Sequence, residues 1–186
     1  TRKESSAASD VYKRQGQKCT AIRRVIVPDT MRRPVVEALR ARIAERGVVG
    51  DPRDKTTTVG ALASPDQREE VVKAVRRLTD AGGTVRVGGL DALDSVPSEG
   101  AFFPVTVLEF DDARTPEVHS VEAFGPVTSV LGYSGSVDEA VELAALGSGS
   151  LVATVCTHDP ETAGAFAAGI GSHHGRVLFL LPLIHI

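Results

Sequence analysis

Cysteine is scarce in this sequence, and long apolar runs are absent from it. The two cysteines, Cys19 and Cys156, lie far apart and lack the paired spacing of zinc ligands, so neither a disulfide framework nor a zinc site is indicated. No apolar stretch reaches the roughly 18 residues that a membrane-spanning helix needs. Together these absences predict a soluble protein in a reduced, cytoplasmic setting.

An excess of charge of one sign is also missing. The 21 lysines and arginines nearly balance the 24 aspartates and glutamates, which leaves a formal net charge of −3. This balance argues against a basic face for nucleic acid or for an anionic membrane, so we expect no partner of either kind. With 186 residues, 42% of them hydrophobic, the chain can bury roughly 70% of its unfolded surface as one globular domain, without a metal staple.

The two ends of the chain differ from its middle. Residues 1–15 are polar, show neither helical nor strand periodicity, and lack the apolar region of a secretory signal. Residues 181–186 are the apolar run LPLIHI. The strings DVYKRQ and LPLIHI resemble translated adapter sequence, so we expect non-native tails at 1–15 and 181–186 around a domain at 16–180. A natural tail and a final strand form the alternative.

The middle of the chain alternates between two periodicities. Strands are predicted at residues 24–27, 84–87, 104–109, 127–133, 151–157 and 175–180, and helices after residues 28 and 64 and near 136–146 and 159–172. The second helix has an N-cap at Ser64 and a proline in its first turn. Such alternation predicts an α/β fold, a mainly parallel sheet with helices on both faces.

Cys19 lies in the string GQKCTAIRR, just before a short helical turn and a strand. The pKa of a free thiol is about 8.5 and falls beside cations or at a helix N-terminus, and the sequence predicts both features here. A thiolate adds to electrophilic carbon, so Cys19 is a candidate nucleophile. The alternative is a small buried hydrophobe, which is the role we expect of Cys156 in its apolar strand.

A second motif, VEAFGPV at residues 121–127, places a carboxylate shortly before a strand. Glu122 can accept hydrogen bonds from the hydroxyls of a ligand, as acidic residues do with the ribose of nucleotide cofactors. A solvated Glu122 and a core Phe124 form the alternative interpretation.

Both motifs resemble those of the aldehyde dehydrogenase superfamily. GQKCTA around Cys19 is similar to the family's active-site cysteine motif, and EAFGPV, which begins 103 residues later, is similar to its Glu-x-Phe-Gly-Pro-Val motif. The resemblance spans residues 16–180 and implies the catalytic domain of that family. It implies that Cys19 attacks the aldehyde, that Glu122 holds the nicotinamide ribose of NAD or NADP, and that Phe124 packs beside the ring.

Longer strings resemble one subgroup of the superfamily. They are GQKCTAIRR, GAFFP at 100–104, GSL at 149–151 and HGRV at 174–177. The subgroup contains CoA-thioester semialdehyde dehydrogenases, among them the dehydrogenase part of the bifunctional ring-opening enzyme of phenylacetate catabolism. The resemblance implies an aldehyde on a CoA thioester as substrate, such as 3-oxo-5,6-didehydrosuberyl-CoA semialdehyde, NADP as preferred oxidant, and a homo-oligomer at full length.

Parts of the family's machinery have no counterpart in this sequence. The general-base glutamate and the oxyanion-stabilising asparagine of the family lie upstream of the cysteine motif, and nothing similar precedes Gly16. The glycine turn of a dinucleotide-binding domain is also missing. We therefore expect a catalytic-domain fragment, inactive alone, that depends on a missing cofactor-binding domain of the same chain.

Other chemistries remain open on the residues alone. A thiol acyltransferase or hydrolase would need a histidine beside Cys19, and the candidates are His119, His158, His173 and His174. We expect His119 and His158 at the surface, and no metal site at the adjacent pair 173–174, because neighbouring side chains point apart. If the dehydrogenase interpretation is right, Cys19 and Glu122 should converge at one edge of the sheet.

Overall fold

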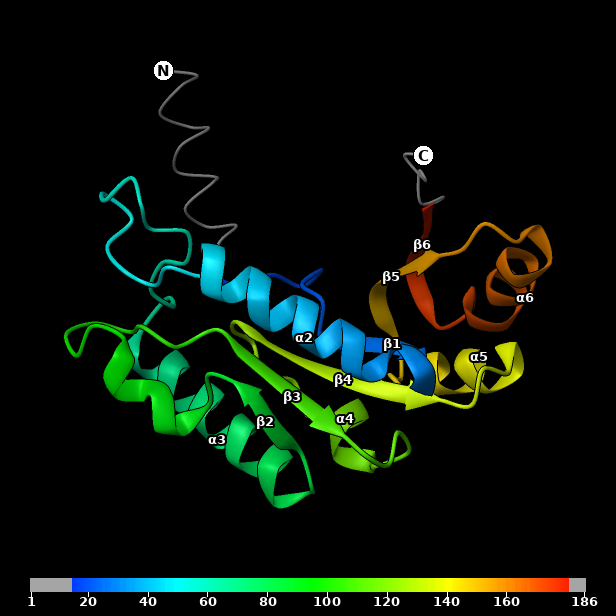
Figure 1. The fold of residues 1–186 in the computed structure, drawn as a ribbon, viewed down its shortest axis with the longest axis horizontal. Coiled ribbons are helices and arrows are strands. Elements are labelled where there is room, and N and C mark those ends of the chain that lie inside the picture. Colours follow the sequence, from blue (N-terminus) through cyan, green and yellow to red (C-terminus); the bar gives the residue numbers. More distant parts are fainter. Residues whose placement is uncertain (1–14, 181–186) are drawn as a thin grey trace.

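The computed structural model describes residues 15–180, so the tails expected at 1–15 and 181–186 lie almost wholly outside the described residues. The elements, labelled in Figure 1, are β1 (Arg24–Pro28), α2 (Asp29–Arg46), α3 (Pro65–Asp80), β2 (Thr84–Val87), the 3-10 helix η1 (Leu90–Ser95), β3 (Thr106–Phe110), α4 (Pro116–Ser120), β4 (Val127–Tyr133), α5 (Val137–Ala145), β5 (Ser150–Cys156), α6 (Pro160–Ile170) and β6 (His174–Leu180). None of the helices described is long and apolar enough to cross a membrane.

The main sheet has four strands in the order β1-β4-β3-β2. Strand β4 pairs in parallel with both β1 and β3, whereas β2 runs antiparallel to β3. A reversed β2 is the natural consequence of its connection, because residues 88–105 contain no crossover helix of the length that a parallel neighbour would need. Strands β5 and β6 pair in parallel as a separate sheet. The predicted α/β fold with a mainly parallel sheet is confirmed.

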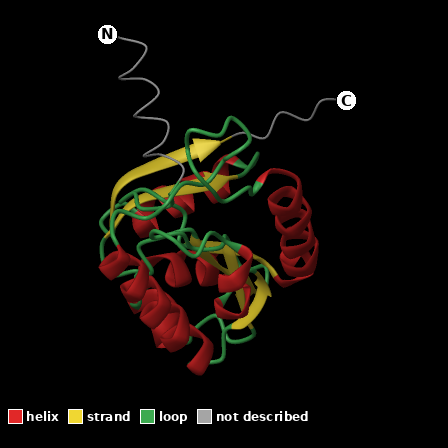
Figure 2. Ribbon diagram, turned by 90° about the vertical axis from the view of Figure 1, so that its left-hand side faces the viewer, coloured by secondary structure: helices red, strands yellow, loops and turns green. Residues whose placement is uncertain are grey.

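Helices cover the main sheet on both faces, as Figures 1 and 2 show. Neighbouring residues of one strand point to opposite faces. Val107 of β3 packs against α2 in a cluster with Val36, whereas Leu108 joins the larger core cluster that contains Val75 of α3 and Leu143 of α5. The chain thus buries both faces of β3, whose five residues are all buried.

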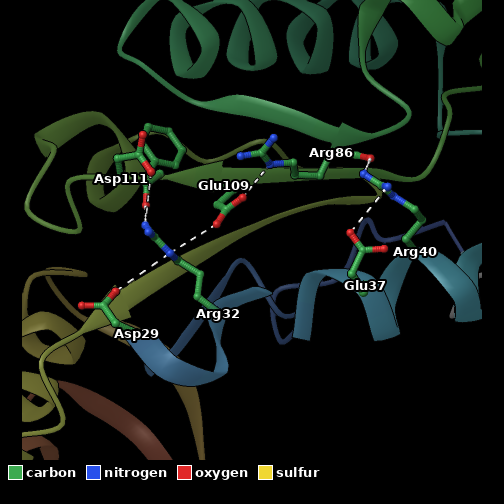
Figure 3. Close-up of polar contacts among 8 residues, drawn as sticks. Asp29, Arg32, Glu37, Arg40, Arg86, Glu109 and Asp111 are labelled. Atoms are coloured by element: carbon green, nitrogen blue, oxygen red, sulfur yellow. Dashed lines mark hydrogen bonds and ion pairs between the residues drawn. The ribbon is translucent and has the colours of Figure 1, made fainter. Parts of the chain in front are cut away.

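A buried carboxylate joins α2 to the sheet. Glu109 of β3 accepts a hydrogen bond from Nε of Arg86 at 2.5 Å and lies 3.2 Å from Nε of Arg32, a residue of α2 (Figure 3). Arg32 also donates to the carbonyl of Phe110 at 3.1 Å and pairs with Asp111 at 3.3 Å. A buried charge is tolerated when it is paired and hydrogen-bonded in this way. The cluster therefore fixes the start of α2, directly after β1, against the middle of the sheet.

Helix α3 begins as the sequence predicts. The hydroxyl of Ser64 accepts a hydrogen bond from the backbone N–H of Gln67 at 3.2 Å, and Pro65 occupies the first helical position. Val71, Val75 and Leu78 then form its buried stripe. This start of α3 lies beside the candidate site.

Cys156 is exposed, and the prediction that it is buried in its strand is wrong. Its neighbour Val155 is buried in a cluster with Ala144 near the end of α5 and Ile170 of α6, against which partly buried side chains of β5 and β6 pack. Side chains alternate along a strand, so Cys156 and its partner Leu180 lie on the opposite face of this sheet, where Leu180 is 45% exposed. The strand was predicted correctly, but the side on which its sheet is covered depends on distant packing.

Candidate active site

The loop that carries Cys19 leads into β1. One turn forms in it, closed by a hydrogen bond from the N–H of Ala21 to the carbonyl of Lys18 at 2.8 Å. No helix follows before β1, so the helix N-terminus expected beside the thiol is absent from the described residues. Cys19 itself is exposed, which excludes the buried hydrophobe that was its alternative. Its thiol can be reached from solvent.

The loop that carries Glu122 leads into β4. Val121 and Ala123 are buried, whereas Glu122 and Phe124 are exposed, with Phe124 at 38%. The alternative of a core phenylalanine is therefore wrong. Among residues 15–180 the carboxylate of Glu122 has no hydrogen-bond or ion-pair partner, and so its oxygens are open to the hydroxyls of a ligand.

The two loops lie at the same edge of the sheet. Strands β1 and β4 are parallel neighbours with Arg24 opposite Ser129, so Cys19 and Glu122 both precede the N-terminal ends of adjacent strands. The loops also touch. A Cβ added to Gly16, whose φ is +72°, would stand 2.6 Å from the carbonyl carbon of Gly125. Only glycine permits this backbone-on-backbone contact, and the expected convergence of the two motifs is found.

Gln17 and helix α3 complete the arrangement. The N–H of Ala63 donates to Oε1 of Gln17 at 2.6 Å, and Nε2 of Gln17 donates to Oε1 of Gln67 at 3.3 Å. Gly125 packs closely against the same helix: a Cβ added at this position would lie 2.9 Å from Cγ2 of Val71, which is too close for a normal contact. Both motif loops therefore rest on the first two turns of α3. No local pattern announces these contacts, and sequence reasoning missed them.

A shallow cleft of about 190 Å³ lies between α3 and the Glu122 loop. Side chains of α3 from Gln67 to Arg77 line one wall, and residues 120–122 and Phe124 line the other. An unpaired carboxylate beside an exposed aromatic ring fits a sugar hydroxyl pair next to a flat heterocycle. Glu122 thus presents two hydrogen-bond acceptor oxygens, and Phe124 a partly exposed ring, to this cleft.

A buried histidine sits between the two loops. His119 of α4 is 5% exposed; its Nε2 lies 2.7 Å from the carbonyl of Ala113 and its Nδ1 lies 2.7 Å from Nη1 of Arg24. Since a carbonyl only accepts, Nε2 carries the proton and Nδ1 accepts from Arg24. Burial, reinforced by the nearby arginines Arg24 and Arg23, lowers the pKa of His119. The surface position expected for His119 is wrong, because it belongs to a short helix that the sequence did not reveal.

Arg24 holds more than His119. It also donates to the carbonyls of Leu143 and Ala144 at the end of α5, each at 3.0 Å. Burial, with a smaller effect of Arg23, lowers the pKa of Arg24 to about 10, so the guanidinium stays charged at neutral pH. Arg23 donates to the carbonyl of His119 at 3.2 Å. The segment after Cys19 is thereby tied to α4, the helix that precedes Glu122.

The geometry gives no support to a cysteine–histidine pair. Both ring nitrogens of His119 are engaged, and Nδ1 of His174 bonds the carbonyl of Ile170 at 3.1 Å. Across residues 15–180 no hydrogen bond joins a histidine to Cys19. The same stretch contains no group of three or more histidine, cysteine, aspartate or glutamate side chains that could hold a metal ion.

Comparisons with known proteins show the family to which the chain is similar. The family model described as "Aldehyde dehydrogenase family" matches residues 3–178. The chain is 36% identical, over 88% of its length and 32% of the relative, to 3,4-dehydroadipyl-CoA semialdehyde dehydrogenase of Aromatoleum evansii. It is 37% identical, over 75% of its length and 29% of the relative, to succinate-semialdehyde dehydrogenase [NADP(+)] 1 of Mycobacterium tuberculosis.

A solved structure is similar as well. The structure of a double mutant of betaine aldehyde dehydrogenase from Staphylococcus aureus, in complex with NAD+, superposes with a TM-score of 0.76 at 27% identity. The match covers 95% of this chain and 35% of that one. The chain thus spans about a third of the length of the proteins that it matches.

Proposed function

The chain belongs to the aldehyde dehydrogenase family, and we propose that it supplies the nucleophile and one wall of the cofactor site of an enzyme that oxidises an aldehyde to an acid with NAD or NADP. One observation carries the proposal. The exposed Cys19 and the unpaired Glu122 stand on loops that touch through Gly16 and Gly125 at one edge of the sheet. A thiol nucleophile and a carboxylate that can accept hydrogen bonds from a ribose, both at one edge, suit hydride transfer from a thiohemiacetal on Cys19 to a bound nicotinamide.

Cys19 performs the covalent steps. Its thiolate adds to the aldehyde carbon and forms a thiohemiacetal, whose oxyanion can accept a hydrogen bond from the backbone N–H of Cys19 itself. Bound NAD or NADP supplies the hydride acceptor. Loss of the hydride turns the thiohemiacetal into a thioester on Cys19. Water attacks this thioester, which releases the acid and restores the thiol.

Glu122 and Phe124 position the cofactor. The carboxylate of Glu122 accepts hydrogen bonds from the ribose hydroxyls, and the ring of Phe124 packs beside the nicotinamide. Holding the reacting groups in one geometry lowers the barrier because no entropy is then lost in the reacting step. Neither residue exchanges a proton or an electron with the substrate.

The remaining parts of such an enzyme would come from a longer polypeptide. Since the relatives are about three times as long as the matched segment, we propose that this chain works joined to a cofactor-binding domain, which also contributes the general base and the oxyanion-binding amide. We further propose a cytoplasmic homo-oligomer at full length. The isolated chain would then be inactive.

The substrate that we propose is a semialdehyde carried on a CoA thioester, in phenylacetate catabolism. Two observations support it: the strings that resemble that subgroup and the name of the Aromatoleum relative. A free semialdehyde is the second candidate, supported by the name of the Mycobacterium relative. The ratio of kcat/KM for a CoA-linked semialdehyde to that for succinate semialdehyde distinguishes the two.

The test of the activity uses the full-length polypeptide. We expect NADP or NAD reduction with one or more aldehydes of a panel, and loss of this reduction in Cys19→Ala. Cys156→Ala is the matched control, because it removes the other exposed cysteine and should leave turnover unchanged. Turnover in Cys19→Ala equal to that of the unmodified enzyme would refute the role of Cys19.

A further inference from the structure

We propose that Gln17 is a positioning residue for Cys19, which fixes the nucleophile loop on the first turn of α3. The inference rests on the proposed function and extends it to a residue outside the assigned roles. Gln17 lies two residues before Cys19, and its side chain crosses to α3, which is 46 to 50 residues further along the chain. Gln17 is not among the residues that line the cleft between α3 and the Glu122 loop.

The nucleophile loop has few other anchors. Lys18, Cys19, Ala21 and Ile22 are all exposed, with Ile22 at 69%. Two backbone bonds within the loop shape it locally, from Lys18 N–H to the Gly16 carbonyl and from Ala21 N–H to the Lys18 carbonyl, but neither ties it to another element. Within the described residues, the side-chain hydrogen bonds of positions 15–22 are the two made by Gln17.

Gln17 suits this task because its amide offers an acceptor and a donor at once. The acceptor, Oε1, satisfies the N–H of Ala63, which stands directly before the N-cap Ser64. The donor, Nε2, reaches Oε1 of Gln67 in the first turn of the helix. The loop is therefore held at two points at the start of α3, one just before the helix and one in its first turn. Gly16 adds a third point, where it packs on Gly125 of the other motif loop.

The consequence concerns the distance between nucleophile and cofactor. Gln67 lines the cleft that Glu122 and Phe124 also line. The amide pair thus joins the loop that carries the attacking sulfur to the helix against which the cofactor end is held. When this tie is cut, the sulfur should drift relative to the aldehyde carbon while the cleft itself stays in place.

Loss of the Gln17 hydrogen bonds should therefore lower kcat and leave the binding of aldehyde and cofactor largely unchanged. A displacement of about 1 Å can lower a rate on the order of 100-fold. We therefore expect Gln17→Met, which has a similar length and no hydrogen-bonding amide, to lower kcat by roughly 10- to 100-fold. The KM values for aldehyde and for NAD or NADP should stay within about three-fold, because Cys19, Glu122 and Phe124 are themselves unchanged.

The experiment compares three variants in the full-length polypeptide. Gln17→Met removes both hydrogen bonds, whereas Gln17→Glu keeps the acceptor for Ala63 and should lower kcat less. Thr79→Val is the matched control, because it also removes one hydrogen bond from α3, but at the other end of the helix. Mass spectrometry of iodoacetamide-treated protein counts the reactive Cys19 thiols, and kcat is expressed per reactive thiol, which corrects for oxidised cysteine. Thermal unfolding followed by circular dichroism shows that each variant is folded at the assay temperature.

We expect kcat per reactive thiol to fall most in Gln17→Met and less in Gln17→Glu, and to stay unchanged in Thr79→Val. A Gln17→Met enzyme whose kcat per thiol is within about three-fold of the unmodified one overturns the inference, as does a Gln17→Met enzyme whose loss lies only in KM. Cys19→Ala, measured beside them, separates the two claims. If it is inactive while Gln17→Met is normal, the inference alone fails; if it is fully active, the proposed function fails.

Discussion

Nη1 of Arg24 lies 2.7 Å from Nδ1 of the buried His119, and this contact joins the segment that follows Cys19 to the helix that precedes Glu122. The same guanidinium closes the end of α5 through two carbonyls. One side chain thus connects three elements around the candidate site. Because its partners are buried or part-buried, they have no ready replacement for it among water molecules.

Replacing Arg24 with methionine should therefore destabilise the protein. The change leaves Nδ1 of His119 and two helix-end carbonyls without their donor, and we expect a loss of about 2–4 kcal/mol in the free energy of unfolding. Urea denaturation measures it. Arg42→Met is the control, since Arg42 makes only an exposed ion pair with Glu45 and should change stability by less than about 1 kcal/mol. Equal losses in the two variants would contradict the role given to Arg24.

His119 predicts a dependence of stability on pH. Its pKa in the folded protein is lowered below the ordinary 6.5, chiefly by burial and then by Arg24 and Arg23. Below about pH 6.5 the unfolded chain takes up a proton that the folded protein refuses, so stability present above that pH is lost as the pH falls toward the lower folded value. His119→Gln removes this component, and the difference between the two urea-derived stability curves should shrink as the pH falls. Parallel curves between about pH 7 and about pH 5 would contradict it.

The contact between the motif loops predicts a strong effect of a methyl group at Gly16. Gly16→Ala strains a φ of +72° and drives a Cβ into the Gly125 carbonyl, whereas Gly82→Ala strains a φ of +100° in open space. Both should cost about 1–2 kcal/mol of stability from the backbone alone. In the full-length enzyme, we expect Gly16→Ala to lower turnover by about ten-fold or more, because the added methyl group displaces the Cys19 loop from the Gly125 loop. An equal effect of Gly82→Ala on turnover would show that strain alone is responsible.

The ion cluster of Glu109 predicts a further stability change. Glu109→Gln leaves Arg32 and Arg86 without the carboxylate between them. Breaking a fully buried pair costs about 3–5 kcal/mol. Solvent reaches both arginines, so we expect about 2–3 kcal/mol here. Glu45→Gln on the exposed face of α2 should change stability by less than about 1 kcal/mol. Thermal unfolding monitored by circular dichroism compares the two, and equal melting temperatures would rule out a structural role of the cluster.

Much of the fold follows from local patterns in the sequence. The predicted strand at 127–133 is β4 to the residue, and Ser64 caps α3 as its position before Pro65 predicted. The same patterns failed where an element is too short to show periodicity. Helix α4 has five residues, too few to show helical periodicity, and His119 was misplaced with it.

For the candidate site, the motifs predicted which two loops meet but not the contacts that hold them together. The cysteine and glutamate motifs indicated Cys19 and Glu122, and alternation placed both before strands. The contacts of Gln17 with Gln67 and of Gly125 with Val71 join segments 50 or more residues apart, and no local pattern encodes them. The prediction of a buried Cys156 was wrong for the same reason. Its exposure depends on which face of β5 and β6 other elements cover, and distant contacts decide this.

The most direct test of the central claim, that Cys19 and Glu122 belong to one site, is the rate of iodoacetamide alkylation at Cys19 in the full-length polypeptide with and without NADP or NAD. Cys156, exposed on a separate sheet, is the internal reference in the same mass spectrum. The account predicts that cofactor changes the alkylation rate of Cys19 but not of Cys156, and that Glu122→Ala raises the cofactor concentration needed for this change. Two results would contradict it: an alkylation rate of Cys19 that saturating cofactor does not change, or a cofactor concentration for this change that is the same in Glu122→Ala.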